Sequence, residues 1–168
     1  EGWSNNCGRV VKKVRAHGKI VSVYSIFSEK VDIIAELLRN KFNALDEAIV
    51  VTGDNTSLKW EKMEEGPRNF YRDHVKNIPE AILLIQYDIL YVDNKIDNNP
   101  FSEKELNILF RYEYKRRKIY DKMKKVSFVS QDISSGEGLK MQIYQMVTLW
   151  INALSEANFK LERLNTIN

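Results

Sequence analysis

Hydrophobic residues gather in short β-rich runs and in longer stretches with helical spacing, which predicts alternating strands and helices. Residues 19–27 are dense in β-branched and aromatic residues and predict a buried strand. Ser28 then stands as an N-cap, and residues 29–43 place apolar side chains on one helical face. A second β-rich run at 47–51 ends at Thr52–Gly53, so the first third of the chain predicts a β–α–β unit.

The middle of the chain predicts two helices around another apolar run. Residues 58–76 favour a helix that is interrupted near Gly66–Pro67. The apolar run within residues 80–93 predicts one long strand or two short ones. Ser102 to Glu105 form a capping box, which predicts a helix from there to about residue 124.

Two interpretations of the C-terminal segment remain open. In the first, residues 126–129 form a strand that leads into a polar turn at Ser134 to Gly138, the kind of place where an open α/β sheet binds ligands. In the second, one long amphipathic helix covers residues 138–165. The residues at helical spacing are Leu139, Ile143, Val147, Ile151 (with Trp150), Leu154, Asn158 and Leu161.

Length and composition are those of an ordinary globular domain. The 168 residues, 43% hydrophobic and 29% charged, fit a single domain spanning 1–168. No apolar run is long enough to cross a bilayer, and the polar N-terminal residues do not resemble a signal peptide. One cysteine, Cys7, cannot form an internal disulfide. We therefore expect an intracellular protein with no membrane partner.

Positive charge is concentrated in one stretch, although the whole chain carries only +3. Residues 111–125 hold eight basic residues against Glu113 and Asp121, a local excess of six positive charges. Such a patch suits a polyanion, with contacts expected from Lys115, Arg116 and Arg117. The alternative is a solvated helix face with no binding role.

The segment SQDISSGEGLKMQ resembles motif V of superfamily-2 helicases, closest to Swi/Snf-like translocases and poxvirus nucleoside-triphosphatases. Lys140 stands where that motif usually has Asn. Residues 160–166 resemble motif VI, with Arg163 at the first arginine and Thr166 in place of the second. KIVSVYSIFS resembles motif IV of the same second, C-terminal RecA-like lobe.

This resemblance implies a three-layer RecA/Rossmann-like α/β domain with a mainly parallel central sheet. Residues from about 60 to 101 would then be an insertion. Arg163 would be the candidate arginine finger. The implied nucleotide-binding residues are Ser135, Gly136, Glu137 and Gly138, and the implied nucleic-acid-binding residues are Ser28, Thr52, Lys115, Arg116, Arg117 and Lys140.

Catalysis by this chain alone is not expected. The sequence contains neither a phosphate loop of the form G-x-x-x-x-G-K-[ST] nor a D-E-x-H box. ATP and Mg²⁺ would be bound only together with an ATP-binding RecA-like lobe from elsewhere, since that lobe carries the phosphate and metal ligands. The sequence shows no cluster of residues that would bind a metal on its own.

Two other functions remain possible from the sequence. Residues 48–58 resemble the A-I-V-N-x-x-N-x-x-L segment of macrodomains, and Ile133–Gly136 resemble their I-S-T-G loop, although the Gly-rich loop is lacking. This resemblance implies a module that binds ADP-ribose or another nucleotide. The third possibility is a non-catalytic α/β interaction domain.

Overall fold

Helices account for most of the structure, a computed structural model that describes residues 2–3, 10–11, 13–16, 19–124 and 136–164, with side chains at 25–119 and 136–164. The helices are α1 (Val23–Glu29), α2 (Val31–Asn43), α3 (Glu65–Lys76), α4 (Ile78–Leu83), α5 (Glu103–Lys124) and α6 (Gly136–Glu156), with a 3₁₀ turn η1 (Trp60–Lys62). The strands pair in twos, as β1 (Gly2–Trp3) with β2 (Val10–Val11), β3 (Lys13–Ala16) with β4 (Lys19–Ser22), and β5 (Tyr87–Tyr91) with β6 (Phe159–Arg163).

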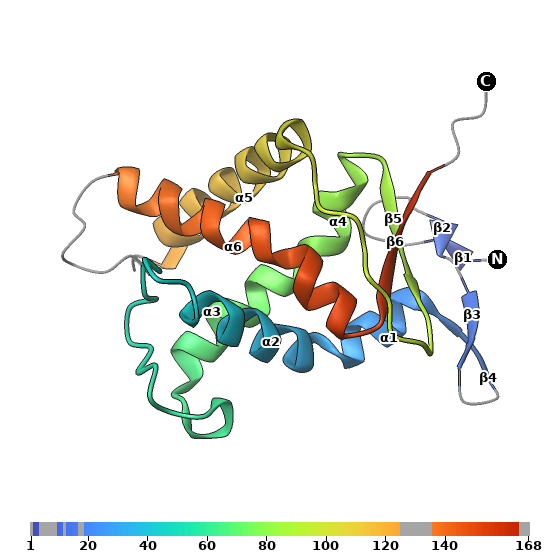
Figure 1. Ribbon diagram of the computed structural model, residues 1–168, viewed down its shortest axis with the longest axis horizontal. Coiled ribbons are helices and arrows are strands. Elements are labelled where there is room, and N and C mark those ends of the chain that lie inside the picture. Colours follow the sequence, from blue (N-terminus) through green and yellow to red (C-terminus); the bar gives the residue numbers. More distant parts are fainter. Residues whose placement is uncertain (1, 4–9, 12, 17–18, 125–135, 165–168) are drawn as a thin grey trace.

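Helix α6 is the centre of the fold and lies between α5 and α2 (Figure 1). Its buried side chains recur at helical spacing, and Trp150 is completely buried in the middle of the core. The apolar residues buried along it are Ile143, Met146, Val147, Trp150, Ile151, Ala153 and Leu154. The periodicity that predicted an amphipathic helix here is therefore confirmed, because helices on two sides cover that face.

Helix α5 begins at the capping box that the sequence predicts. Glu105 N donates to Ser102 Oγ at 3.1 Å, and Ser102 N donates to Glu105 Oε1 at 2.8 Å. These two bonds satisfy backbone N–H groups that a helix N-terminus otherwise leaves without partners. The start of the long helix is thus fixed by four consecutive residues.

The chain leaves α6 through Asn158, whose φ of 66° is the left-handed conformation in which helices commonly end. Strand β6 then pairs antiparallel with β5, with Phe159 opposite Tyr91 and Arg163 opposite Tyr87. The Asn98 side chain also holds β6, because its amide group donates to Phe159 O at 2.8 Å and accepts from Leu161 N at 2.8 Å.

The expected three-layer RecA/Rossmann-like fold with a mainly parallel central sheet is wrong. Every strand pair among the described residues is antiparallel, and none of these sheets has more than two strands. The run at 19–27 supplies strand β4 only as far as Ser22, after which α1 covers residues 23–29. Ser28 lies inside α1 and is not an N-cap.

Residues 47–51 form a turn and an irregular segment instead of a strand, because side chains of α6 occupy their backbone groups. Gln142 Nε2 donates to Ile49 O at 2.7 Å, and Ile49 N donates to Gln145 Oε1 at 3.1 Å. Gln145 Nε2 donates in turn to Glu47 O at 2.8 Å. Two glutamines one helical turn apart thus take the place of a neighbouring strand, so the predicted β–α–β unit does not form.

The C-terminal half follows the helical interpretation as far as residue 156, beyond which β6 replaces the expected continuation to residue 165. The predicted strand at 126–129 lies outside the described residues. Residues 60–101, expected to be an insertion, supply Trp60, Phe70 and Tyr71 to the same core as α6. Where the structure describes the chain, no helix combines the length and apolar character needed to cross a membrane.

We predict that Gln142→Ala destabilises the protein by about 1–3 kcal/mol, because it leaves the partly buried Ile49 carbonyl without the amide that it accepts from. Urea unfolding followed by circular dichroism measures this loss. Asn152→Ala, on an exposed position of the same helix, is the control and should change stability by less than about 0.5 kcal/mol. Equal effects of the two substitutions would contradict the role given to Gln142.

Candidate nucleic-acid interface

The inner face of α5 contains a carboxylate, Glu113, which is completely buried. The guanidinium of Arg116, one turn further along the helix, pairs with it, with Nε 3.0 Å from both carboxylate oxygens. Burial raises the pKa of the Glu113 carboxyl above its ordinary value, and Arg116 offsets part of this effect. Arg116 is therefore engaged by its own helix.

His74 on α3 lies against the same carboxylate. Trp150 Nε1, which can only donate, lies 3.1 Å from His74 Nδ1, so the ring carries its proton on Nε2. That nitrogen faces Glu113 Oε1 at 3.5 Å. Burial, with smaller contributions from Arg116 and Arg117, lowers the pKa of His74 well below its ordinary value of 6.5 and keeps the ring neutral.

Arg117 is also internal, with only 1% of its surface exposed. Its guanidinium lies over the Phe70 ring, 3.9 Å from the centroid, in a cation–π contact. The side chains of His74, Glu113, Arg116 and Arg117 form what we call the buried polar cluster. It joins α3, α5 and α6 and fixes which side of α5 faces inward.

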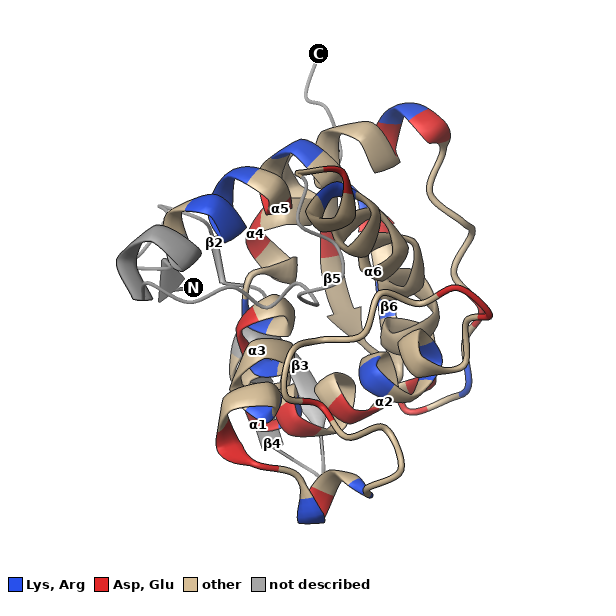
Figure 2. Cartoon of the chain, turned by 90° about the vertical axis from the view of Figure 1, so that its left-hand side faces the viewer, with Lys and Arg blue, Asp and Glu red and all other residues tan. Residues whose placement is uncertain are grey.

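The opposite face of α5 carries exposed basic residues. Lys104, Arg111, Lys115 and Lys118, here called the basic stripe, are all exposed. At 3.6 residues per turn they fall within about 60° of arc, centred roughly 180° from Glu113. Among the described residues no carboxylate pairs with any of these four cations. Figure 2 shows Lys and Arg segments recurring along this outer side of α5.

Aromatic side chains lie beside the basic stripe, where α5 meets the first turns of α6. Phe110 and Tyr114 stack with centroids 5.8 Å apart, and Tyr144 of α6 meets Phe110 edge-on at 6.4 Å. The ammonium groups of Lys118 and Lys140 lie 5.1 and 6.0 Å from the Tyr114 ring centroid. A groove of about 280 Å³, here called the aromatic groove, is lined by Asn107, Phe110, Glu137, Lys140, Met141 and Tyr144.

The structure brings together only part of the predicted nucleic-acid-binding set. Lys115 and Lys140 are exposed on neighbouring helices, whereas Arg116 is held by Glu113 and Arg117 is internal. Thr52 and Ser28 are exposed on other elements, the loop after α2 and helix α1. Helix α1 lies at the other end of the molecule from the start of α6 (Figure 1). Sequence reasoning missed Lys104 as part of the same helical face.

The predicted nucleotide-binding turn is the beginning of α6. Gly136, Glu137 and Gly138 are its first three residues, and Ser135 lies outside the described residues. The Glu137 carboxylate is exposed and lies 3.5 Å from Lys140 Nζ. Of these residues Glu137 lines the aromatic groove, and Gly136 to Gly138 belong to the helix and not to the turn that the resemblance implied.

Arg163, the candidate arginine finger, stands at the end of β6. Its guanidinium lies 4.7 Å from the Tyr87 ring centroid and 3.8 Å from Glu105 Oε2, and its side chain is largely exposed. Thr166, the position of the missing second arginine, lies outside the described residues. These contacts account for Arg163 as a surface residue that ties β6 to β5 and α5.

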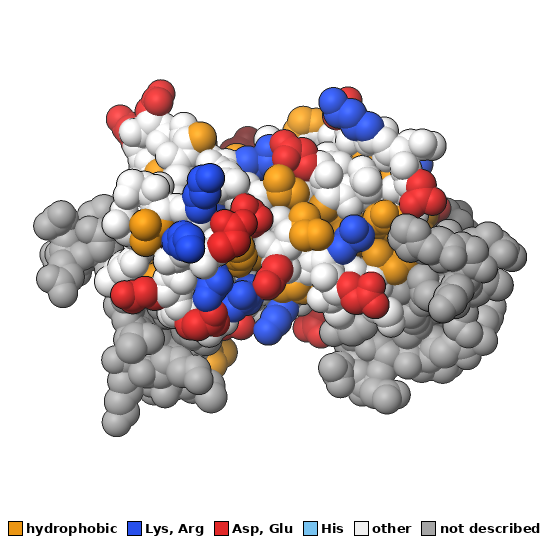
Figure 3. Space-filling view, turned by 90° about the horizontal axis from the view of Figure 1, so that it is seen from below, with side chains coloured by type: hydrophobic (Ala, Val, Ile, Leu, Met, Phe, Trp, Pro, Cys, Tyr) orange, Lys and Arg blue, Asp and Glu red, His pale blue; other side chains and the backbone are white. Residues whose placement is uncertain are grey.

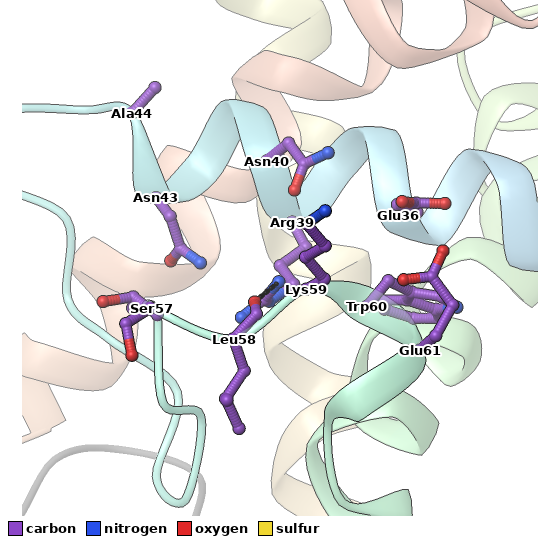
Figure 4. A pocket seen from close by; sticks show the side chains of 11 residues that line it. Glu36, Arg39, Asn40, Asn43, Ala44, Ser57, Leu58, Lys59, Trp60 and Glu61 are labelled. Atoms are coloured by element: carbon purple, nitrogen blue, oxygen red, sulfur yellow. Dashed lines mark hydrogen bonds between the residues drawn. The ribbon is translucent and has the colours of Figure 1, made fainter.

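A second hollow, about 450 Å³ in volume, lies between α2 and residues 56–61 (Figure 4). Behind it, Asp54 accepts from Arg39 Nη2 at 2.8 Å and from the Tyr71 hydroxyl at 2.8 Å. Burial and the Asp54 charge raise the pKa of Tyr71, so its hydroxyl stays protonated and donates. Because Arg39, Asp54 and Tyr71 satisfy one another, this cluster serves to pin the loop onto α2 and α3.

Charges on the face seen in Figure 3 are mixed, with acidic and basic side chains interspersed. Opposite charges also pair directly outside α5, since Arg72 lies 2.6 Å from Asp32 and 3.0 Å from Glu65. In the part of the chain that the structure describes, no group of three or more His, Cys, Asp or Glu side chains is placed to hold a metal ion. The unbalanced charge of the basic stripe is thus a local feature of α5.

No protein-family model matches the chain, and neither a curated protein nor a solved structure is significantly similar to it. The helicase and macrodomain resemblances therefore rest on the short motifs alone.

The buried polar cluster predicts a specific pH dependence of stability. In the folded protein the pKa of His74 is far below its ordinary value of 6.5. Below pH 6.5 the unfolded chain therefore binds a proton at this residue, whereas the folded chain does not. The stability that His74 contributes is thus present above pH 6.5 and is lost as pH falls. We predict that the stability difference between wild type and His74→Gln shrinks by about 1.4 kcal/mol between pH 7.5 and 5.5.

Urea unfolding of both proteins at the two pH values measures this change. The comparison cancels the titration of groups that behave alike in both proteins. A difference that stays constant, or that grows as pH falls, would show that the buried ring becomes charged.

Proposed function

We propose that this chain is a nucleic-acid-binding domain that contacts phosphates through the basic stripe of α5. The observation that carries the proposal is the segregation of charge on this helix. Lys104, Arg111, Lys115 and Lys118 share one exposed face, and no described carboxylate neutralises them. A row of cations without counter-charges is the electrostatic footprint of a polyanion partner.

The dimensions of the stripe suit a strand of nucleic acid. From Lys104 to Lys118 the helix rises about 21 Å at 1.5 Å per residue. One strand of B-form DNA carries a phosphate about every 3.4 Å of axis, so a stripe of this length faces about six phosphates. Each neutralised phosphate releases condensed counterions, and this release is the main source of sequence-independent affinity.

A merely solvated helix face explains the pattern less well. Exposed lysines elsewhere, such as Lys59, Lys62 and Lys76, are spread over a loop, η1 and the end of α3, whereas the four cations of the basic stripe share one face of a single helix. The acidic residue at the middle of α5, Glu113, is buried and paired with Arg116. The carboxylate at the middle of the helix is thus held in the interior, while the basic stripe stays exposed.

The proposal does not extend to an ATPase site shared with a partner lobe, or to ADP-ribose binding. Both resemblances place their nucleotide at the carboxyl edge of a parallel sheet. The described strands pair antiparallel in twos, and Gly136 to Gly138 begin a helix. What remains is a binding role, with DNA and RNA as equally suitable polyanions.

We predict salt-sensitive binding that depends on the basic stripe. Four phosphate contacts give a slope of log affinity against log salt of about −3 to −4. In the triple variant Arg111→Gln, Lys115→Gln, Lys118→Gln, the slope should fall by about 1 for each cation removed. Fluorescence anisotropy of labelled DNA and RNA at several salt concentrations measures both quantities.

The matched control is Lys59→Gln, Lys62→Gln, Lys76→Gln, which removes the same charge from exposed positions on other elements. Its salt slope should equal that of wild type. If both triple variants lose affinity equally, net charge and not the basic stripe determines binding. If the wild type does not bind at low salt, the proposal is wrong.

A further inference from the structure

We infer that the preferred ligand is single-stranded, and that the aromatic groove between α5 and α6 stacks one of its unpaired bases. This inference rests on the proposed function and specifies the form of nucleic acid that the same face binds. The groove runs directly beside the basic stripe, because Asn107, Phe110 and Tyr114 occupy the adjacent face of α5. Phosphates on the stripe would therefore hold a base within reach of the groove.

The groove offers flat apolar surface that is open to solvent. Met141 is 54% exposed and Tyr144 is 41% exposed, although both are large apolar side chains on a helix whose other face forms the core. Phe110 forms the opposite wall, with its ring 6.4 Å from that of Tyr144. Aromatic rings next to a cationic track are the arrangement with which proteins bind single strands without reading sequence.

Charge at the rim of the groove fits a neutral base in the groove and phosphates outside it. Glu137 is the acidic residue among the lining side chains, and its carboxylate lies 3.5 Å from the ammonium of Lys140. That pair is neutral in sum, so the net positive charge belongs to α5. Tyr114 lies between the two, since Lys118 of the stripe and Lys140 of the groove both contact its ring.

Size limits what the groove can hold. A volume of about 280 Å³ is at the small end of ligand pockets and suits one planar ring system. The bases of a duplex are stacked on each other and can enter such a groove only at the cost of several kcal/mol for unstacking. Duplexes should still bind the stripe through phosphates, but without the stacking contribution.

The experiment compares a single strand of about 12 nucleotides with a duplex of the same length, for wild type and Tyr144→Ala. A fluorescent adenine analogue placed mid-strand reports stacking, because its emission falls when it is stacked on a ring. Wild type should bind the single strand about tenfold more tightly than the duplex and quench the analogue. Tyr144→Ala should lose that tenfold preference and the quenching, while its affinity for the duplex stays unchanged.

Two controls separate stacking from general loss of structure. Tyr144→Phe keeps the ring and should behave as wild type, and Leu84→Ala removes an exposed apolar side chain at the C-cap of α4. If both nucleic acids bind through the stripe but Tyr144→Ala changes neither preference nor quenching, the single-strand inference fails and the proposed function stands. If the stripe variant leaves all binding intact, the proposed function itself fails.

Discussion

Glu113 is a fully buried carboxylate, and the arrangement of the surrounding helices follows from the need to compensate its charge. An uncompensated charge in a protein interior costs several kcal/mol, so the folded core has to supply its partners. Arg116 supplies the ion pair, while His74 of α3 lies against one oxygen and is itself fixed by Trp150 of α6. Three helices thus depend on a single side chain, which sets the rotation of α5.

That rotation decides what α5 presents to solvent. With Glu113 and Arg117 turned inward, Lys104, Arg111, Lys115 and Lys118 are left on the outer face, where no described carboxylate pairs with them. Solvated lysines and arginines cost little in the folded state, because water and mobile counterions compensate their charge. The inner face of α5 therefore contributes to stability, and its outer face carries the proposed function. The aromatic groove lies where α5 contacts α6.

Features fixed by neighbouring residues were predictable from the sequence, and features fixed by distant ones were not. The capping box at Ser102 and the apolar face of α6 are local signals, and both are confirmed. Residues 47–51 look like a strand, but their backbone is bound by Gln142 and Gln145, almost a hundred residues away in the sequence. The basic run lies on the predicted helix, but the sequence analysis did not separate its buried residues from its exposed ones. The spacing could have shown this, because Leu109, Glu113 and Arg117 lie four residues apart and share one side of the helix.

The measurement that tests the central claim most directly is lysine footprinting, in which acetylation rates are read by mass spectrometry with and without saturating single-stranded nucleic acid. If α5 contacts phosphates through its outer face, Lys104, Lys115 and Lys118 lose reactivity on binding, as does Lys140 at the groove. Lys59, Lys62 and Lys76, exposed on other elements, keep their rates. Protection of that second group, with the lysines of α5 unchanged, would contradict the account.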